Sequence, residues 1–233
     1  MAFERLRGRW ERTTAPLLKL FGGLQPNHLT WASLLVALAA AAIAWTADRS
    51  SPLSWLSVAG LMGLAFLLDG LDGQLARQRG LSGRAGDLLD HTLDRIVDAA
   101  LLVALGSNPN WFLSHELGPV LGWSAALATM LGSYMGTAAQ SVGLARDYGG
   151  FSRADRSIIL LLGVLGAAMQ SLTQWPGLST PSLFGGRLQW NSLSLALVIS
   201  LLGGLITFYL RFKRSLRELR ENPEPSDFSD SER

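Results

Sequence analysis

The chain has 233 residues, of which 48% are hydrophobic and only 16% are charged, and its formal net charge is +2. Soluble proteins usually carry about 25% charged residues, so this composition argues against an ordinary soluble domain. The absence of cysteine excludes disulfides, thiolate zinc sites and a thiol nucleophile. Only three histidines are present, which disfavours a histidine-rich metal site.

Residues 1–24 predict an amphipathic helix that lies in the membrane interface. Apolar residues recur at helical spacing from Phe3 to Leu24, and five basic residues stand mostly between them. These basic residues are spread through the segment, and no early apolar core precedes a cleavage site, which argues against a signal peptide. Pro26 and Asn27 then end the segment.

Six long uncharged runs follow, and they predict six transmembrane helices. A spanning helix needs about 20 mostly apolar residues. Four runs reach or nearly reach this length, while the second and third reach it only by including part of an aspartate-rich stretch. A soluble protein with buried helices is the alternative, but six such runs exceed any ordinary core. We therefore expect an all-α integral membrane protein with helices over residues 27–47, 53–79, 85–106, 118–145, 153–174 and 190–213.

Basic residues predict how these helices are oriented. The segments on one side hold sixteen basic residues, whereas the opposite loops hold only Arg49 and Arg187. Cytoplasmic loops carry the excess of lysine and arginine, so both termini and the turn after the second helix should be cytoplasmic in a multi-pass cell-membrane protein. We expect a six-helix transmembrane domain over residues 25–215 and a polar, disordered cytoplasmic tail over residues 216–233.

The stretch DGLDGQLARQRGLSGRAGDLLDHTLD, residues 69–94, places carboxylates where two membrane helices meet a tight turn. Asp69 and Asp72 share one face of the second helix, because residues three apart lie on the same side of a helix. On the third helix, aspartates at spacings of three, four and four form a continuous stripe. The glycine-rich turn at 80–84 should bring the two sets face to face. The stripe on the third helix comprises Asp87, Asp90, Asp94 and Asp98.

Carboxylates gathered in a partly dehydrated bundle need compensation. A charge at bilayer depth costs at least about 2.5–3.5 kcal/mol, and neighbouring like charges repel one another. The aspartates can be protonated, as in a proton path, or they can bind divalent cations. Oxygen ligands without thiolate or histidine favour hard cations such as Mg²⁺, Mn²⁺ or Ca²⁺, and two such ions would suit phosphoryl transfer.

Gly73 and Gly86 lie beside these carboxylates, and a glycine inside a helix costs about 1 kcal/mol relative to alanine. We favour the interpretation that both glycines leave room for a ligand. Close helix packing is the alternative, and we prefer it for Gly132 and Gly136. Arg77, one turn past Gly73, can neutralise a phosphate beside the metals or serve only as an interface anchor.

The pattern of these residues resembles the signature of the CDP-alcohol phosphotransferase family, and it matches at every defined position. The resemblance covers about residues 1–213, and the segment PNHLT at 26–30 resembles the one that precedes the first membrane helix of these enzymes. The matching positions are Asp69, two residues, Asp72-Gly73, two residues, Ala76-Arg77, eight residues, Gly86, three residues, Asp90, three residues and Asp94.

The resemblance implies a metal-dependent transferase of membrane-lipid synthesis. Such enzymes move a substituted phosphoryl group, phosphatidyl or archaetidyl, from a CDP-linked lipid to the hydroxyl of a polar alcohol and release CMP. By resemblance, Asp69, Asp72 and Asp90 hold two Mg²⁺ or Mn²⁺ ions, and Asp94 is the general base that can also contact a metal. The implied partners are the lipid donor, the alcohol acceptor, membrane lipids and a second copy in a homodimer, with no nucleic acid. The pocket for the CDP group would be shaped by Gly73, Ala76, Arg77 and Gly86.

The acceptor is less sharply defined by the sequence. The chain length favours the branch that uses a CDP-linked diacylglycerol, or its ether counterpart, with a water-soluble alcohol. Arg153 and Arg156 stand where the fifth predicted helix begins, and arginines at a helix N-terminus can form an anion site, so we favour a phosphorylated polyol. Both arginines can instead be positive-inside anchors. The uncharged SYMGTAAQ at 133–140 departs from inositol-phosphate-using members, which leaves glycerol phosphate, serine and other polar alcohols open.

Two other classes of function would also explain the aspartates. A cation or proton transporter would use an acidic intramembrane path, but the sequence shows neither a broken helix nor a two-fold repeat. A scaffold without catalysis is disfavoured by the complete set of signature aspartates. Asp87 and Asp98 lie outside the signature: Asp87 suits the start of a helix, and Asp98 can pair with Arg95.

Overall fold

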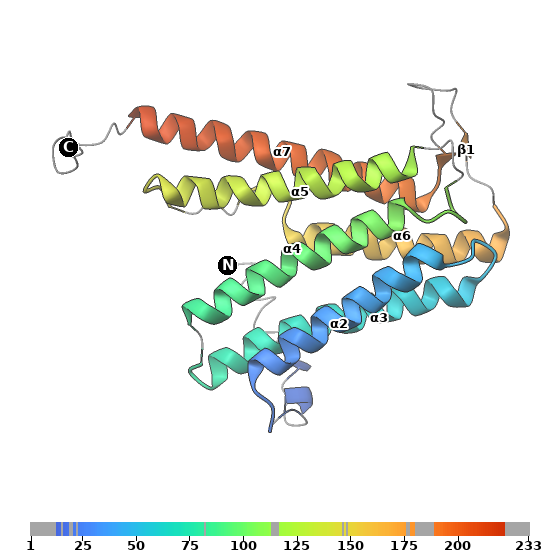
Figure 1. Cartoon of the computed structure of the whole chain (residues 1–233), viewed down its shortest axis with the longest axis horizontal. Coiled ribbons are helices and arrows are strands. Elements are labelled where there is room, and N and C mark those ends of the chain that lie inside the picture. Colours follow the sequence, from blue (N-terminus) through green and yellow to red (C-terminus); the bar gives the residue numbers. More distant parts are fainter. Residues whose placement is uncertain are drawn as a thin grey trace.

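The computed structural model contains six helices and two very short strands in its described part (Figure 1). The described residues are 13–14, 16–18, 21, 23–81, 83–112, 117–145, 147, 149–175, 178–179 and 189–221. The predicted amphipathic helix over residues 1–24 lies mostly outside them. The elements are α2 (Pro26–Thr46), α3 (Pro52–Gln78), α4 (Arg84–Gly106), α5 (Gly118–Ser141), α6 (Arg153–Thr173), β1 (Leu178–Ser179), β2 (Gln189–Trp190) and α7 (Ser192–Glu221).

The six described helices close into a ring in which each helix packs mainly against two neighbours, with a smaller contact between α4 and α7. The order around the ring is α2, α3, α6, α7, α5 and α4, and α4 returns to α2. Figure 1 shows α5 and α7 side by side at one edge of the bundle, with α2 and α3 paired at the other. Within the described part of the chain, α4 and α6 do not pack directly against each other. Side chains rather than backbone contacts therefore connect these two helices.

Buried apolar side chains from all six helices fill the centre of the ring. At the end of the bundle away from the aspartates, Trp55 and Trp111 meet edge to face with ring centroids 5.0 Å apart. The Asn108 amide, fully buried after the end of α4, donates hydrogen bonds of 2.7 and 3.0 Å to the carbonyls of Ala44 and Ala47 at the end of α2. These contacts hold the far end of the bundle together.

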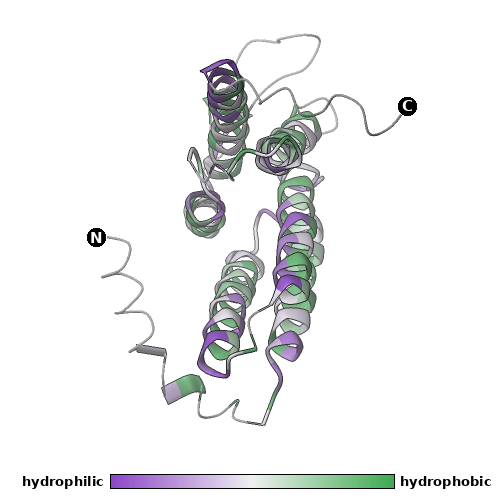
Figure 2. Cartoon of the chain, turned by 90° about the vertical axis from the view of Figure 1, so that its left-hand side faces the viewer, coloured by the Kyte–Doolittle hydropathy of each residue, from purple (hydrophilic) through white to green (hydrophobic). Residues whose placement is uncertain are grey.

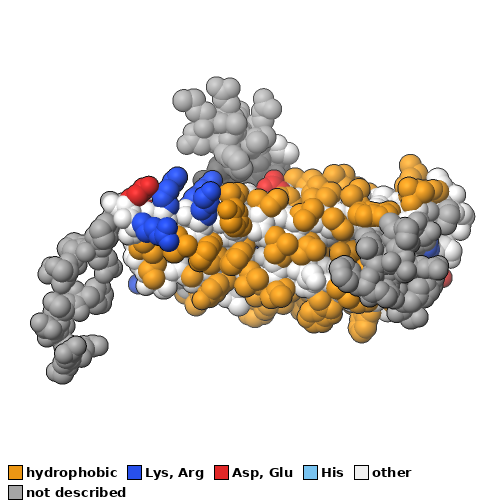
Figure 3. Space-filling view, turned by 90° about the horizontal axis from the view of Figure 1, so that it is seen from above, with side chains coloured by type: hydrophobic (Ala, Val, Ile, Leu, Met, Phe, Trp, Pro, Cys, Tyr) orange, Lys and Arg blue, Asp and Glu red, His pale blue; other side chains and the backbone are white. Residues whose placement is uncertain are grey.

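Four helices, α2, α3, α6 and α7, are long and apolar enough to cross a membrane. Only 33% to 44% of their most apolar windows is buried inside the bundle, so most of this apolar surface faces outward. Figure 3 shows hydrophobic side chains along the face seen from above, with lysines and arginines gathered at one end. Two of the six expected spans do not qualify by composition, because α4 carries the aspartate stripe and α5 is diluted by glycine, serine and threonine.

The helix boundaries agree with the prediction to within one or two residues except at two ends. We expected the fourth helix to reach residue 145, but α5 ends at Ser141. Gly143, at φ +82°, turns the chain there, and the amides of Gly143 and Leu144 bond back to the carbonyls of Gln140 and Ala139. A glycine in the left-handed region is a common helix terminator. The uncharged run continues past this glycine to residue 145, which is why the sequence predicts a longer helix.

The last helix is longer than predicted. We ended it at residue 213 and assigned residues 216–233 to a disordered tail, but α7 continues to Glu221, so residues 216–221 are helical. Leucine, arginine and glutamate are good helix formers, and Arg217 and Glu221 lie 3.8 Å apart at an i,i+4 spacing. The all-α prediction also missed a small antiparallel pair in which Leu178 faces Trp190.

The turn between α3 and α4 sets the position of the predicted site. Gly80 has φ +65°, and the amides of Gly80 and Leu81 bond to the carbonyls of Arg77 and Ala76. This pattern closes a helix and reverses the chain, so the end of α3 and the start of α4 lie at the same end of the bundle, although these two described helices do not pack directly against each other. Figure 2, viewed from this end, shows hydrophilic residues at the ends of several helices.

Candidate functional site

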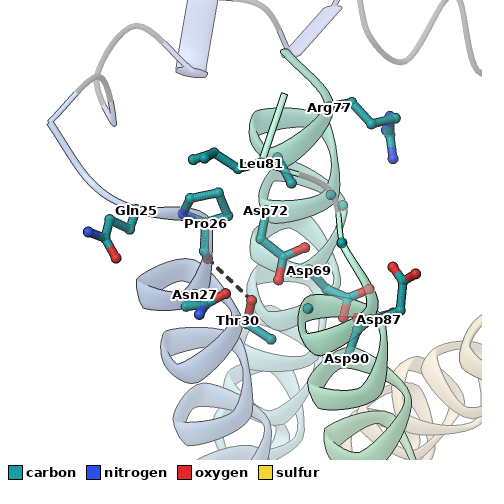
Figure 4. A pocket seen from close by; sticks show the side chains of 15 residues that line it. Gln25, Pro26, Asn27, Thr30, Asp69, Asp72, Arg77, Leu81, Asp87 and Asp90 are labelled. Atoms are coloured by element: carbon teal, nitrogen blue, oxygen red, sulfur yellow. Dashed lines mark hydrogen bonds between the residues drawn. The ribbon is translucent and has the colours of Figure 1, made fainter. Parts of the chain in front are cut away.

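Three carboxylates from α3 and α4 converge at this end of the bundle. Asp69, Asp72 and Asp90 each offer an oxygen, and these oxygens all lie within 4.8 Å of one another. Figure 4 shows Asp69 and Asp72 pointing from α3 toward the first turns of α4, where Asp87 and Asp90 lie. The tight turn at Gly80 therefore brings the signature aspartates together as the sequence predicted.

These residues suit a divalent metal ion. Asp72 is only 6% exposed, and its Oδ2 atom is buried without a hydrogen-bond partner. A buried carboxylate oxygen is costly unless a cation or a donor satisfies it. A metal ion held by Asp69, Asp72 and Asp90 would satisfy this oxygen, and an all-oxygen ligand set is what Mg²⁺ and Mn²⁺ prefer.

His91 is a possible ligand that the sequence analysis did not single out. It offers a nitrogen near Asp90 and Asp94, and the ligand atoms of these three residues also lie within 4.8 Å of one another. Its Nδ1 is 3.9 Å from Asp90 Oδ2, and the histidine side chain is 48% exposed. The only signal in the sequence was its place between two signature aspartates.

A cavity of about 800 Å³ opens beside the carboxylates. Residues from the start of α2, the end of α3 and the start of α4 surround it, as Figure 4 shows. Thr30 is anchored there by a 3.2 Å hydrogen bond to the Pro26 carbonyl. Four of the predicted pocket residues, Gly73, Ala76, Arg77 and Gly86, line this cavity together with Asp69, Asp72, Asp87 and Asp90.

The two glycines of the signature are not required by helix packing. A Cβ atom built on Gly86 would meet nothing within 4 Å, and one on Gly73 would meet only the tip of the Arg77 side chain at 3.3 Å. Gly86 faces open space and Gly73 meets only the end of a flexible side chain, which favours the interpretation that both leave room for a ligand. At Gly132 the packing interpretation holds, because a Cβ atom there would lie 3.3 Å from the Gly204 carbonyl of α7.

Asp94 lies one turn deeper on α4 and is 8% exposed. One nitrogen of Arg153, Nη1, is 2.7 Å from Asp94 Oδ1 and 2.9 Å from Asp69 Oδ2. The first residue of α6 thus bridges a carboxylate of α3 and a carboxylate of α4. We had placed Arg153 in an acceptor site, and the structure places it against the predicted metal ligands as well.

A second, smaller cavity of about 90 Å³ lies on the other side of Arg153. Arginine side chains, hydroxyl groups and backbone atoms of α5 and α7 line this cavity. Two of these arginines, Arg95 and Arg211, were not predicted as site residues. The sequence predicted Arg95 as an ion-pair partner of Asp98, and Arg211 as one of the basic residues that set the membrane orientation. The lining includes Arg95, Thr129, Ser133, Ser152, Arg153, Arg156 and Arg211.

Arg156, which lines the smaller cavity, forms a buried ion pair with Asp98. Its Nη2 atom contacts Asp98 Oδ2, and both side chains are nearly inaccessible. Asp98 also lies 3.4 Å from Arg95, which confirms the pairing expected from the sequence. The Arg156 Nε atom and the Thr129 hydroxyl, however, are buried without hydrogen-bond partners, and both residues line the small cavity. Unsatisfied donors in a cavity favour an anionic or polar ligand.

The loop before α6 is fixed against α7 and α5. The Phe151 amide donates to Thr207 Oγ1 at 2.8 Å, and Arg211 donates to the carbonyls of Gly149 and Gly132 at 3.0 and 2.8 Å. Burial alone would raise the pKa of Asp147, but the Gly149 amide and the Arg214 guanidinium together hold that pKa below its usual value. These contacts position the N-terminus of α6, and with it Arg153.

Replacing Asp72 by asparagine should weaken metal binding strongly. The substitution removes the charge of the most buried carboxylate in the cluster. The affinity for Mn²⁺ should fall by more than the about 10–100-fold loss that is typical when an outer-shell partner is removed. Electron paramagnetic resonance of free Mn²⁺ during a titration of the purified protein measures this affinity.

Asp87→Asn is the matched control, because Asp87 lines the same cavity but belongs to neither group of converging ligand atoms. Its Mn²⁺ affinity should stay close to that of the wild type. Equal Mn²⁺ affinities of the wild type and Asp72→Asn would contradict the assignment of Asp72 as a ligand.

Known proteins resemble this chain over most of its length. The phosphatidylinositol phosphate synthase of Cutibacterium acnes is 29% identical over 167 residues, which cover 69% of this chain and 76% of that protein. The crystal structure of phosphatidylinositol phosphate synthase from Mycobacterium tuberculosis with CDP-DAG bound is 25% identical. Its TM-score is 0.66, with 94% of this chain and 98% of that one covered.

A second structure of the Mycobacterium tuberculosis enzyme, in complex with manganese and citrate, has a TM-score of 0.64 at 25% identity and covers 89% of this chain and 88% of that one. The family model described as CDP-alcohol phosphatidyltransferase matches residues 24–203. This match extends from the start of α2 into α7 and includes every signature position. The chain therefore belongs to the CDP-alcohol phosphatidyltransferase family, as its aspartate signature indicated.

Proposed function

We propose that this enzyme transfers a phosphatidyl or ether-lipid phosphoryl group from a CDP-linked lipid to a phosphorylated polyol and releases CMP. The observation that carries the proposal is the convergence of Asp69, Asp72 and Asp90 within 4.8 Å beside a large cavity. Inositol phosphate is the first candidate acceptor, because relatives are named phosphatidylinositol phosphate and archaetidylinositol phosphate synthases.

The larger cavity is the proposed site of the CDP group. Asp69, Asp72 and Asp90 would hold one or two Mg²⁺ or Mn²⁺ ions, which when bound neutralise the diphosphate and stabilise charge on the transferred phosphoryl group. Arg77 lines the same cavity and can pair with a phosphate. Gly73 and Gly86 leave open space against the backbone for the nucleotide.

Asp94 is the proposed general base. As the acceptor hydroxyl forms a new bond to the lipid-linked phosphorus, Asp94 takes the hydroxyl proton, and the bond from that phosphorus to CMP breaks with its electron pair leaving on CMP. Asp94 is buried beside the predicted metal ligands, and Arg153, which lines the smaller cavity, contacts both Asp94 and Asp69.

The smaller cavity is the proposed site for the acceptor's phosphate. Four arginines line this cavity. Their positive charge is only partly balanced by the carboxylates of Asp98 and Asp94. The uncharged stretch at 133–140 argues against inositol phosphate as the acceptor. In this chain, positive charge comes instead from Arg95 on α4 and Arg211 on α7, while Ser133 contributes a hydroxyl to the lining. Arg153 and Arg156 complete the set, as their positions at the start of α6 suggested.

We also propose that all six helices cross the membrane with both termini and the site on the cytoplasmic side. The bias in basic residues supports this orientation, and the polar tail of α7 continues the cluster of lysine and arginine at that end. Family resemblance further supports a homodimer, which light scattering of the purified protein would test.

An acceptor panel tests the reaction. Purified enzyme in liposomes with Mn²⁺ and labelled CDP-diacylglycerol should release CMP with inositol phosphate and much more slowly with unphosphorylated inositol, because only the former satisfies the arginines of the smaller cavity. Glycerol phosphate and serine complete the panel. Absence of CMP release with every acceptor would contradict the enzymatic proposal, whereas a preference for inositol would contradict only the phosphate site.

Asp94→Asn should reduce turnover by at least about 100-fold, the lower range for loss of a general base, because asparagine cannot accept the hydroxyl proton. Binding of the CDP-lipid in the presence of Mn²⁺ should remain near the wild-type level, as measured by isothermal titration calorimetry. A parallel loss of CDP-lipid binding would show that Asp94 acts chiefly as a metal ligand.

Single cysteines test the orientation, because the chain contains no cysteine. Ser50 and Glu218 are exposed at opposite ends of the bundle. In intact cells, a membrane-impermeant maleimide should label Ser50→Cys, and it should label Glu218→Cys only after permeabilisation. The reverse pattern would overturn the proposed orientation, and labelling of both in intact cells would overturn the even number of spans.

A further inference from the structure

The Asp69–Arg153 ion pair lies at the boundary between the two cavities. Asp69 lines the larger cavity and Arg153 lines the smaller one, and their side chains are 2.9 Å apart. The same Arg153 nitrogen is 2.7 Å from Asp94. A single guanidinium from α6 therefore contacts both the proposed metal site and the proposed acceptor site.

The guanidinium and a metal ion would use the same two carboxylate groups, since Asp69 and Asp94 each belong to a group of converging ligand atoms. Arg153 Nη1 contacts Asp69 Oδ2 and Asp94 Oδ1, and both residues are in the signature set of ligands. A carboxylate oxygen that coordinates a divalent cation is poorly placed to accept a strong bond from an arginine as well, because the two cations repel at such distances. Metal and Arg153 should therefore compete for Asp69 and Asp94.

Arg153, which lines the smaller cavity, can also donate a further hydrogen bond. Its Nε atom is buried without a hydrogen-bond partner. The backbone around it is fixed by the Ser152–Asp155 capping box at the start of α6 and by the Phe151–Thr207 hydrogen bond. A side chain on such an anchored backbone can change its partner by rotating about its own bonds, without moving α6.

We propose that Arg153 exchanges between the carboxylates and the acceptor's anion, so that metal binding and acceptor binding promote each other. When Asp69 is engaged by a metal ion held with Asp72 and Asp90, Arg153 would turn its guanidinium into the smaller cavity and complete the anion site. An anion that draws Arg153 away likewise frees the two carboxylates for metal. By linkage, each ligand must raise the affinity for the other by the same factor. This inference rests on the proposed function, because it takes the smaller cavity as the acceptor site.

The test measures Mn²⁺ binding rather than turnover. The purified protein is titrated with Mn²⁺ at constant ionic strength, in chloride and in sulfate, with sulfate as a soluble tetrahedral anion. Electron paramagnetic resonance follows the free ion. In the wild type, sulfate should tighten Mn²⁺ binding about fivefold or more, within the usual range of coupling between sites.

Arg153→Gln should bind Mn²⁺ more tightly than the wild type in chloride, because the internal competitor is gone, and sulfate should leave that affinity unchanged. Arg217→Gln is the control. Arg217 is an exposed arginine that pairs with Glu221 and lines neither the larger nor the smaller cavity. The control should leave both the Mn²⁺ affinity in chloride and the effect of sulfate at the wild-type level. Thermal unfolding confirms that each variant is folded.

Two results would overturn the proposal. Sulfate without effect on the wild type would show that the sites are not coupled. A full sulfate effect in Arg153→Gln would show that attraction between cation and anion is sufficient without exchange of the arginine. Neither result would contradict the proposed reaction, which is judged by CMP release in the acceptor panel. Conversely, loss of CMP release with intact coupling would contradict the reaction alone.

Discussion

Repulsion among closely spaced, partly buried carboxylates is the constraint on which this structure depends. Asp69, Asp72, Asp90 and Asp94 are drawn together by the tight turn after α3, in surroundings where an uncompensated charge is expensive. Compensation comes from outside the hairpin, through Arg153 on α6 and through the cation that the free oxygen of Asp72 favours. The site therefore ties α6 to a pair of helices distant from it in sequence.

The arrangement of the bundle follows from this requirement. α4 and α6 have no direct packing in the described part of the chain, and the arginine–carboxylate contacts bridge the space between them. A closely packed pair of helices would leave no room for a polar substrate. The separation creates the smaller cavity, and the buried Arg156–Asp98 pair keeps the two helices in register across it. Breaking such a pair usually costs about 3–5 kcal/mol.

Local spacing made much of the site predictable. Residues three or four apart on a helix share a face, so Asp69 with Asp72, and Asp90 with Asp94, could be aligned from the sequence alone, and the glycine-rich turn indicated that the two sets of carboxylates face each other. The expectation that α3 and α4 also pack as neighbours was wrong, because α2 lies between them. The helices were predictable because lipid demands long uncharged runs. The helix ends were less so: Gly143 ends α5 within an apolar run, and charged helix formers extend α7 to Glu221.

Contacts between distant segments could not be predicted in this way. No local pattern shows that Arg153 would contact Asp69, 84 residues earlier in the chain, or that Arg211 would fix the loop before α6. Both arginines belong to segments rich in basic residues that the sequence predicts to be cytoplasmic, where positive charge is also expected for topology alone. The pairing of Arg156 with Asp98 was missed for the same reason, since it depends on how α4 and α6 face each other in the ring.

The two cavities also bear on the order of chemical events. Because they lie on either side of the Asp69–Arg153 pair, the proposed donor and acceptor sites could be filled at the same time. A lipid-linked phosphorus between them can be attacked from one side while the nucleotide departs on the other. Such an arrangement has no need of a covalent lipid–enzyme intermediate. It corresponds to a single displacement within a ternary complex, with inversion of configuration at phosphorus.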